Sequence, residues 1–141
     1  MSPLTLAQAN QIIAAALARS QESGYKPMAV AVLDDAGNLK AFAREDGASM
    51  FRFEVARGKA WGAVGMGVSS RVLGQRAKEN PNFFLSLAAT ASGKFLPQTG
   101  AVLIKDGSGQ VLGAVGASGG TGDEDELICI AGVEAAGLSA G

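Results

Sequence analysis

The sequence predicts a single α+β domain, with an antiparallel sheet of about five strands covered by helices. Short apolar runs flank two turn sequences rich in Asp and Gly, a pattern typical of β-hairpins. Longer segments with apolar residues at helical spacing precede, separate and follow these hairpins. Because the chain has 141 residues and 48% of them are hydrophobic, it can bury one core, and we expect one domain over residues 1–141.

Two of the expected helices begin with a capping box, in which a threonine and a residue three positions later satisfy each other's backbone N–H groups. Thr5 and Gln8 form the first box, and the apolar stripe after them predicts a helix over residues 6–22. Thr121 and Glu124 form the second box, which places the start of the last helix at Thr121. The acidic first turn of that helix would repel a phosphate, so the preceding glycines do not indicate a phosphate loop. The expected inward residues of this helix are Leu127, Ile130, Ala131, Ala135 and Leu138.

The two hairpins are expected at residues 28–44 and 101–117, with turns at 34–38 and 106–109. Asp34 is expected to stabilise the first turn by accepting hydrogen bonds from nearby backbone N–H groups.

Three further helices are expected between the hairpins. Ser49 is the expected cap of the first, Ser69 or Ser70 of the second, and Asn80 of the third, with Pro81 in its first turn and Gly93 at its end. The expected apolar face of the first of these helices comprises Met50, Phe53, Ala56, Ala60 and Val64, with Trp61 at its edge.

Composition excludes several classes of function. A net charge of −1 with one Trp and one Tyr argues against a nucleic-acid partner. The first residues lack a signal sequence and no stretch reaches about 20 apolar residues, so we expect a cytoplasmic protein without a membrane segment. The absence of histidine excludes Ser-His and Cys-His catalysis, ordinary zinc sites and a proximal histidine on haem, and no metal site is predicted. Cys129 lies among apolar residues and is expected to be a buried structural thiol.

Several polar residues are candidates for a site, each with an alternative. Lys59 lies in a Gly- and Ala-rich helix. One alternative is a lysine that is solvated or paired with a carboxylate. The other is a lysine that faces a pocket, where partial burial would lower its pKa and let it act as an acid, a base or a carboxylate-binding group. Arg44 and Asp46 follow the second strand and form either a local ion pair or, through Arg44, a clamp for a substrate carboxylate.

The remaining candidates surround the start of the last helix. Ser118, Gly119 and Gly120 offer backbone amides before Thr121, and Asp125 follows as a base, as Asp46 does after the second strand. Together with the cations, this set suits a cofactor-free tautomerase, lyase or hydratase acting on a small organic acid.

Four segments resemble the GlcG/HbpS-like haem-binding (haem-degrading-type) family, which includes the C-terminal domain of some cobalamin adenosyltransferases. They are VLDDAGNL (32–39), REDGA (44–48), ARGKA (56–60) and GAVGASGGT (113–121), with Asp125 soon after. The resemblance implies a profilin-like α/β sandwich that assembles into homo-oligomers, and a small-molecule ligand such as haem or another tetrapyrrole.

Without histidine, the candidate axial ligands for haem are Tyr25, Cys129 and the methionines. Tyr25 is the best placed of them, because it is expected in a loop. The sequence thus leaves open a small-molecule-binding protein, an acid–base enzyme and a purely structural oligomer.

Overall fold

The computed structural model describes residues 2–141 and confirms the α+β class. Five strands form one sheet in the order β2-β1-β4-β3-β5, and all neighbouring strands are antiparallel. The elements are α1 (Leu6–Glu22), β1 (Ala29–Asp34), β2 (Leu39–Arg44), α2 (Phe51–Met66), α3 (Ser70–Glu79), α4 (Pro81–Thr90), β3 (Ala101–Lys105), β4 (Val111–Ser118), α5 (Gly122–Ala135) and β5 (Ser139–Ala140).

Both predicted hairpins are present, as β1–β2 and β3–β4, and they join through the β1–β4 pair. Asp34 stabilises the first turn as expected, because its Oδ1 accepts the amides of Ala36 and Asn38 at 3.0 and 2.9 Å. The strand β5 has only two residues, and no hydrophobic pattern in the sequence had indicated its position.

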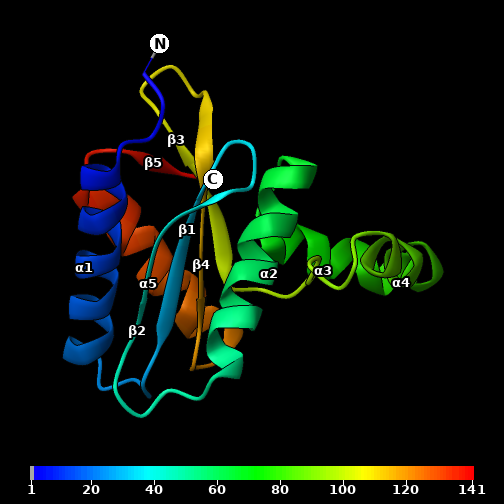
Figure 1. Ribbon diagram of the computed structural model, residues 1–141, viewed down its shortest axis with the longest axis horizontal. Coiled ribbons are helices and arrows are strands. Elements are labelled where there is room, and N and C mark those ends of the chain that lie inside the picture. The colour runs from blue at the N-terminus through cyan, green and yellow to red at the C-terminus, as the bar shows by residue number, and fades with distance from the viewer. Residues whose placement is uncertain (1) are drawn as a thin grey trace.

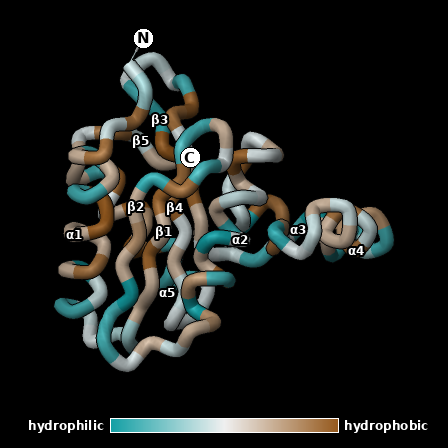
Figure 2. Tube along the Cα trace, in the orientation of Figure 1, coloured by the Kyte–Doolittle hydropathy of each residue, from teal (hydrophilic) through white to brown (hydrophobic). Residues whose placement is uncertain are grey.

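The sheet lies between two helical layers (Figure 1). Helices α1 and α5 pack against each other and cover one face, while α2 covers the other face along β1 and β4. Strands β1 and β4 are therefore buried on both sides, and the apolar segments concentrate along them and on the inner side of α1 (Figure 2). Among residues 2–141, no helix is both long and apolar enough to cross a membrane.

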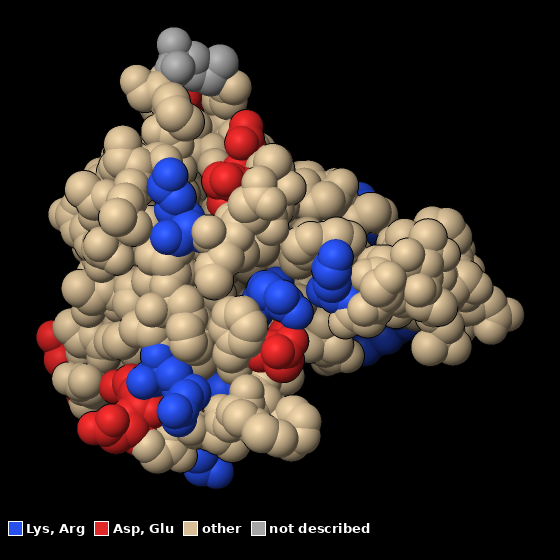
Figure 3. All heavy atoms as spheres, viewed as in Figure 1, with Lys and Arg blue, Asp and Glu red and all other residues tan. Residues whose placement is uncertain are grey.

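Helices α3 and α4 extend sideways from this body as an arm (Figure 1). A small apolar cluster of Leu73, Phe84 and Phe95 holds the arm together. Helix α4 has no charged side chain, and the end of the arm is accordingly uncharged in Figure 3. Phe83 and Leu85 are exposed on it.

The caps of the middle helices differ in part from those expected. Ser69 caps α3 through its hydroxyl, and Pro81 occupies the first turn of α4, as predicted. Ser49 does not cap α2, because the chain is already helical at Met50, which becomes the N-cap without a side-chain hydrogen bond. The side chain of Asn80 likewise makes no capping hydrogen bond.

The predicted inward face of α5 was right only in part, because Leu127, Ile130 and Leu138 pack against the core from its edge. Its buried residues are Asp125, Ile128, Cys129, Gly132 and Val133, whereas Leu127, Ile130, Ala131 and Leu138 are only half-buried and Ala135 is exposed. The apolar spacing misled because a glycine and a carboxylate belong to the buried face. Similarly, α2 turns Gly58, Lys59 and Gly62 inward, while Met50 is exposed.

Candidate functional site

A buried ion pair between α2 and α5 forms the centre of the candidate site. Lys59 is 4% exposed, and its Nζ donates to Asp125 Oδ2 at 3.0 Å and to the carbonyl oxygen of Ala117 at 3.1 Å. Asp125 is 2% exposed, and its Oδ1 accepts the backbone N–H of Gly120 at 3.0 Å. The first alternative for Lys59 allowed a solvated or a carboxylate-paired side chain, and the side chain is paired and not solvated. The second alternative placed Lys59 at a pocket, and it lines one as well.

Small residues bring the elements close enough for this pair to form. A Cβ at Gly116 of β4 would lie 2.2 Å from the carbonyl oxygen of Ala56, so only glycine lets α2 approach the sheet there. Gly100 has φ +136°, which favours glycine, and a Cβ there would lie 2.6 Å from Lys59 Nζ. These glycines form the narrow space in which the lysine is held.

Burial raises the pKa of two groups here, the carboxyl group of Asp125 and the thiol of the nearby Cys129. Burial raises the pKa of Asp125 above its ordinary value, and the charge and hydrogen bond of Lys59 and the Gly120 amide offset this only in part. Burial also raises the pKa of the Cys129 thiol, which donates to the carbonyl oxygen of Gly100 and stays protonated. Cys129 is thus the buried structural thiol that the sequence indicated.

A pocket of about 430 Å³, here called the Lys59 pocket, opens beside the ion pair. Its lining includes Lys59, Asp125, Ser118, Gly120 and Thr121, which are five of the sequence-predicted site residues.

Arg52 also lines the Lys59 pocket, and the sequence analysis missed it. It lies in the first turn of α2, and its Nη1 donates to Ser118 Oγ at 2.8 Å. The sequence signal that could have indicated Arg52 was weak, because it consists of one arginine among apolar residues at the start of this helix.

Thr121 and Glu124 form the predicted capping box at the start of α5, with hydrogen bonds of 3.2 and 2.9 Å. Arg71 of α3 binds both Asp123 and Glu126 on the outer side of the same helix. These contacts occupy the other acidic residues of the first turns, so Asp125 is the carboxylate that faces Lys59.

The other sequence-predicted residues lie elsewhere. Tyr25, Arg44 and Asp46 line a separate cleft of about 470 Å³, here called the Tyr25 cleft, together with Gln21, Pro27 and Glu45. Arg44 donates to the carbonyl oxygen of Ala48 and makes no ion pair with Asp46.

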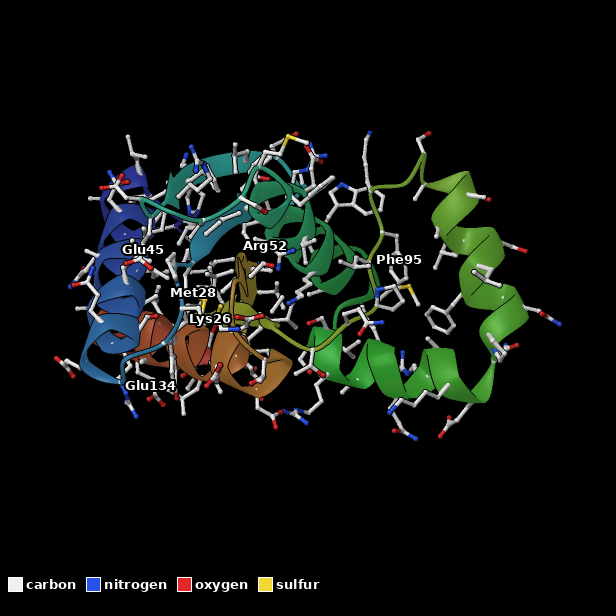
Figure 4. The ribbon with its side chains drawn as sticks, turned by 90° about the horizontal axis from the view of Figure 1, so that it is seen from below. Lys26, Met28, Glu45, Arg52, Phe95 and Glu134 are labelled. Atoms are coloured by element: carbon white, nitrogen blue, oxygen red, sulfur yellow. The ribbon has the colours of Figure 1, made fainter. Side chains whose placement is uncertain are left out.

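A third hollow, of about 290 Å³, is lined by Gly119, Lys26 and Arg52 among others. In Figure 4, which looks at the molecule from below, Met28 and Lys26 are labelled between Glu45 and Arg52. Glu45 lines the Tyr25 cleft, and Lys26 and Arg52 line this hollow. Within residues 2–141, no three His, Cys, Asp or Glu side chains are grouped so that they could hold a metal ion.

Comparison with known proteins identifies the family. Residues 4–134 match the model of the HbpS-like haem degrading proteins, and the chain belongs to this family. A search of curated protein sequences finds no match.

Solved structures agree with this assignment. The PduOC–haem complex is 25% identical with a TM-score of 0.86, and the match covers 98% of each chain. The Klebsiella pneumoniae protein ORFY is 25% identical with a TM-score of 0.87, covering 97% of this chain and 93% of that one. An HbpS double mutant from Streptomyces reticuli is 27% identical with a TM-score of 0.81, covering 95% and 87%.

Proposed function

We propose that this protein binds a small molecule and that its ligand is haem or another tetrapyrrole. The observation that carries this proposal is the likeness, over 98% of the chain, to a protein whose structure holds haem. Membership of the HbpS-like family supports the same class of ligand.

Two residues of the Tyr25 cleft, Tyr25 and Arg44, support such a ligand. Haem needs an axial donor, and the chain has no histidine. Cys129 and Met28 are fully buried, and the exposed Met50 and Met66 do not line the Tyr25 cleft. Tyr25 is half-buried in the cleft, and its hydroxyl has no hydrogen-bond partner among the described residues. Arg44 is exposed on the same lining and supplies a cation for a haem carboxylate. Haem bound there would contribute its iron chemistry, and this chain would hold it through Tyr25 and Arg44.

Titration of the protein with ferric haem, followed at the Soret band, tests this proposal. We expect saturable binding, a changed spectrum in Tyr25→Phe because the axial donor is lost, and weaker binding in Arg44→Gln. Arg57→Gln is the control, since Arg57 pairs with Glu54 away from the cleft. A titration without saturation contradicts haem as the ligand, and an unaltered Tyr25→Phe spectrum contradicts Tyr25 as the donor.

A second candidate function, an acid–base enzyme for a small organic acid, is favoured by the buried Lys59–Asp125 pair. In a keto acid, the Asp125 carboxylate would take a proton from the carbon next to the carbonyl group. The electron pair of the C–H bond would move to the carbonyl oxygen, where Lys59 stabilises the enolate, and Asp125 would return the proton to another carbon. Asp46, which lines the Tyr25 cleft, has no part in this scheme.

Absorbance assays with unsaturated keto acids test the second candidate. We expect turnover that is lost in both Lys59→Ala and Asp125→Asn and kept in Arg57→Gln. Turnover that survives in Asp125→Asn contradicts the proton transfer.

We further propose that the protein is a cytoplasmic homo-oligomer. The uncharged helix α4 with its exposed Phe83 and Leu85 supports self-association, because exposed apolar surface that forms a patch marks an interaction site on many proteins. Light scattering that gives the 14.2 kDa of one chain at micromolar concentration would contradict the oligomer.

A further inference from the structure

We infer that the Lys59 pocket binds a small organic monocarboxylate and that Arg52 is its anchor. This inference rests on the second candidate function in one respect, the use of the Lys59 pocket. It adds the chemical class of the ligand that this pocket would bind. It is independent of haem, whose proposed residues lie in the Tyr25 cleft. Binding can be measured without turnover, so the two can fail separately.

The geometry of Arg52 suits a carboxylate. A guanidinium has five N–H donors, and within residues 2–141 the side chain uses Nη1 alone, toward Ser118 Oγ. That hydrogen bond fixes the guanidinium at the pocket, because Ser118 is itself 1% exposed. No Asp or Glu of the described chain lies within ion-pair distance of Arg52, whereas Arg57 and Arg71 both have carboxylate partners. Arg52 therefore keeps paired N–H donors free, as a bidentate carboxylate contact requires.

The floor of the pocket offers a second, buried donor. The ammonium group of Lys59 has three N–H bonds, and its two acceptors are Asp125 Oδ2 and the Ala117 carbonyl oxygen. One N–H bond has no partner among the described residues, and the side chain is more than nine-tenths buried while lining the pocket. An oxygen next to the ligand's carboxylate, such as a keto or hydroxyl oxygen, would accept it.

The charged side chains that line the Lys59 pocket favour a ligand with a single negative charge. Two carboxylates line the pocket, and each is already paired, Asp125 with Lys59 and Asp123 with Arg71. Arg52 is the cation of the lining that has no ion-pair partner among the described residues. A volume of about 430 Å³, the half-buried guanidinium of Arg52 and the buried ammonium group of Lys59 suit a small ligand with one carboxylate and one further oxygen.

Ligand-observed NMR titration with pyruvate tests the inference, with pyruvamide as its uncharged counterpart. We expect pyruvate to bind and pyruvamide to bind at least about tenfold more weakly, because the charge-assisted pair with Arg52 is lost. Arg52→Gln should weaken pyruvate by at least about tenfold, and Arg52→Lys by less, since it keeps the charge without the planar fork. Arg57→Gln, a change of the same kind on the same helix, should leave binding unaltered.

Three results would overturn the inference: no binding of pyruvate, equal binding of pyruvamide, or equal effects of Arg52→Gln and Arg57→Gln. Binding of pyruvate through Arg52 without any turnover of keto acids would support the inference while contradicting the enzyme. Far-ultraviolet circular dichroism of each variant separates loss of the anchor from loss of the fold.

Discussion

Removing Lys59 should destabilise the protein strongly, because the change leaves the carboxylate of Asp125 buried without its partner. Both side chains are nearly inaccessible, with 6% and 3% of their surfaces exposed. Breaking a buried pair on one side costs about 3–5 kcal/mol. We expect Lys59→Met to lower the free energy of unfolding by about this amount, a large part of the 5–15 kcal/mol of a typical domain.

The double variant Lys59→Met/Asp125→Leu should cost less than the two single changes added together. It removes both charges, although the Gly120 N–H and the Ala117 carbonyl oxygen lose a partner. Residues in one buried network show coupling of about 0.5–3 kcal/mol, and we expect the upper end of that range.

Urea titration at one protein concentration measures all four proteins of this cycle. The exposed pair Glu54–Arg57 in the same helix is the matched control, and Arg57→Met should cost no more than about 1 kcal/mol. If Lys59→Met cost no more than Arg57→Met, or if the cycle were additive, the two groups would not form a buried ion pair and the reasoning would be refuted.

Three further predictions concern the cap, the acidity of Asp125 and helix packing. Thr121→Ala should cost about 0.5–2 kcal/mol in denaturant titration, because the Glu124 amide loses its acceptor, and a loss of less than a few tenths would contradict the cap. The folded state holds the Asp125 proton more tightly than the unfolded state does, because the pKa is raised on folding. The contribution of Asp125 to the free energy of unfolding should therefore fall as the pH rises above the ordinary pKa of 3.8. Asp125→Asn should remove this dependence on pH. A slope of the opposite sign would mean that the pKa is lowered. Gly65→Ala should stabilise by about 1 kcal/mol because a Cβ there meets open space. Gly132→Ala should instead destabilise, because its Cβ would lie 2.5 Å from the Ile12 carbonyl oxygen, and equal effects of the two glycine changes would contradict this packing.

Local signals in the sequence predicted the framework of the fold well. The capping boxes at Thr5 and Thr121 and the Asp34 turn depend on residues within four positions of one another, so their chemistry is visible in the sequence. The inward face of α5 was predicted only in part, because apolar spacing cannot show that Gly132 is buried by the approach of α1. Tertiary packing decides such positions.

The site was predicted in part, for a related reason. Lys59 and Asp125 were both candidates, but the hydrogen bond between them joins residues 66 positions apart. The sequence grouped Arg44 and Asp46 with them, whereas β2 ends at a different opening of the molecule. Arg52 was missed because nothing in its neighbours reveals that Ser118, also 66 positions away, binds its guanidinium.

The glycines of the chain connect the framework to the site. A residue larger than glycine at position 116 would push α2 away from β4, because its Cβ would meet the Ala56 carbonyl oxygen. Lys59 lies one turn further along that helix, so such a shift would draw its Nζ away from both Ala117 and Asp125. The same shift would move Arg52 relative to Ser118, since both contacts join α2 to the end of β4. The close approach of helix and strand is therefore a condition for the buried pair and for the arginine anchor together, although Gly116 itself does not line the pocket.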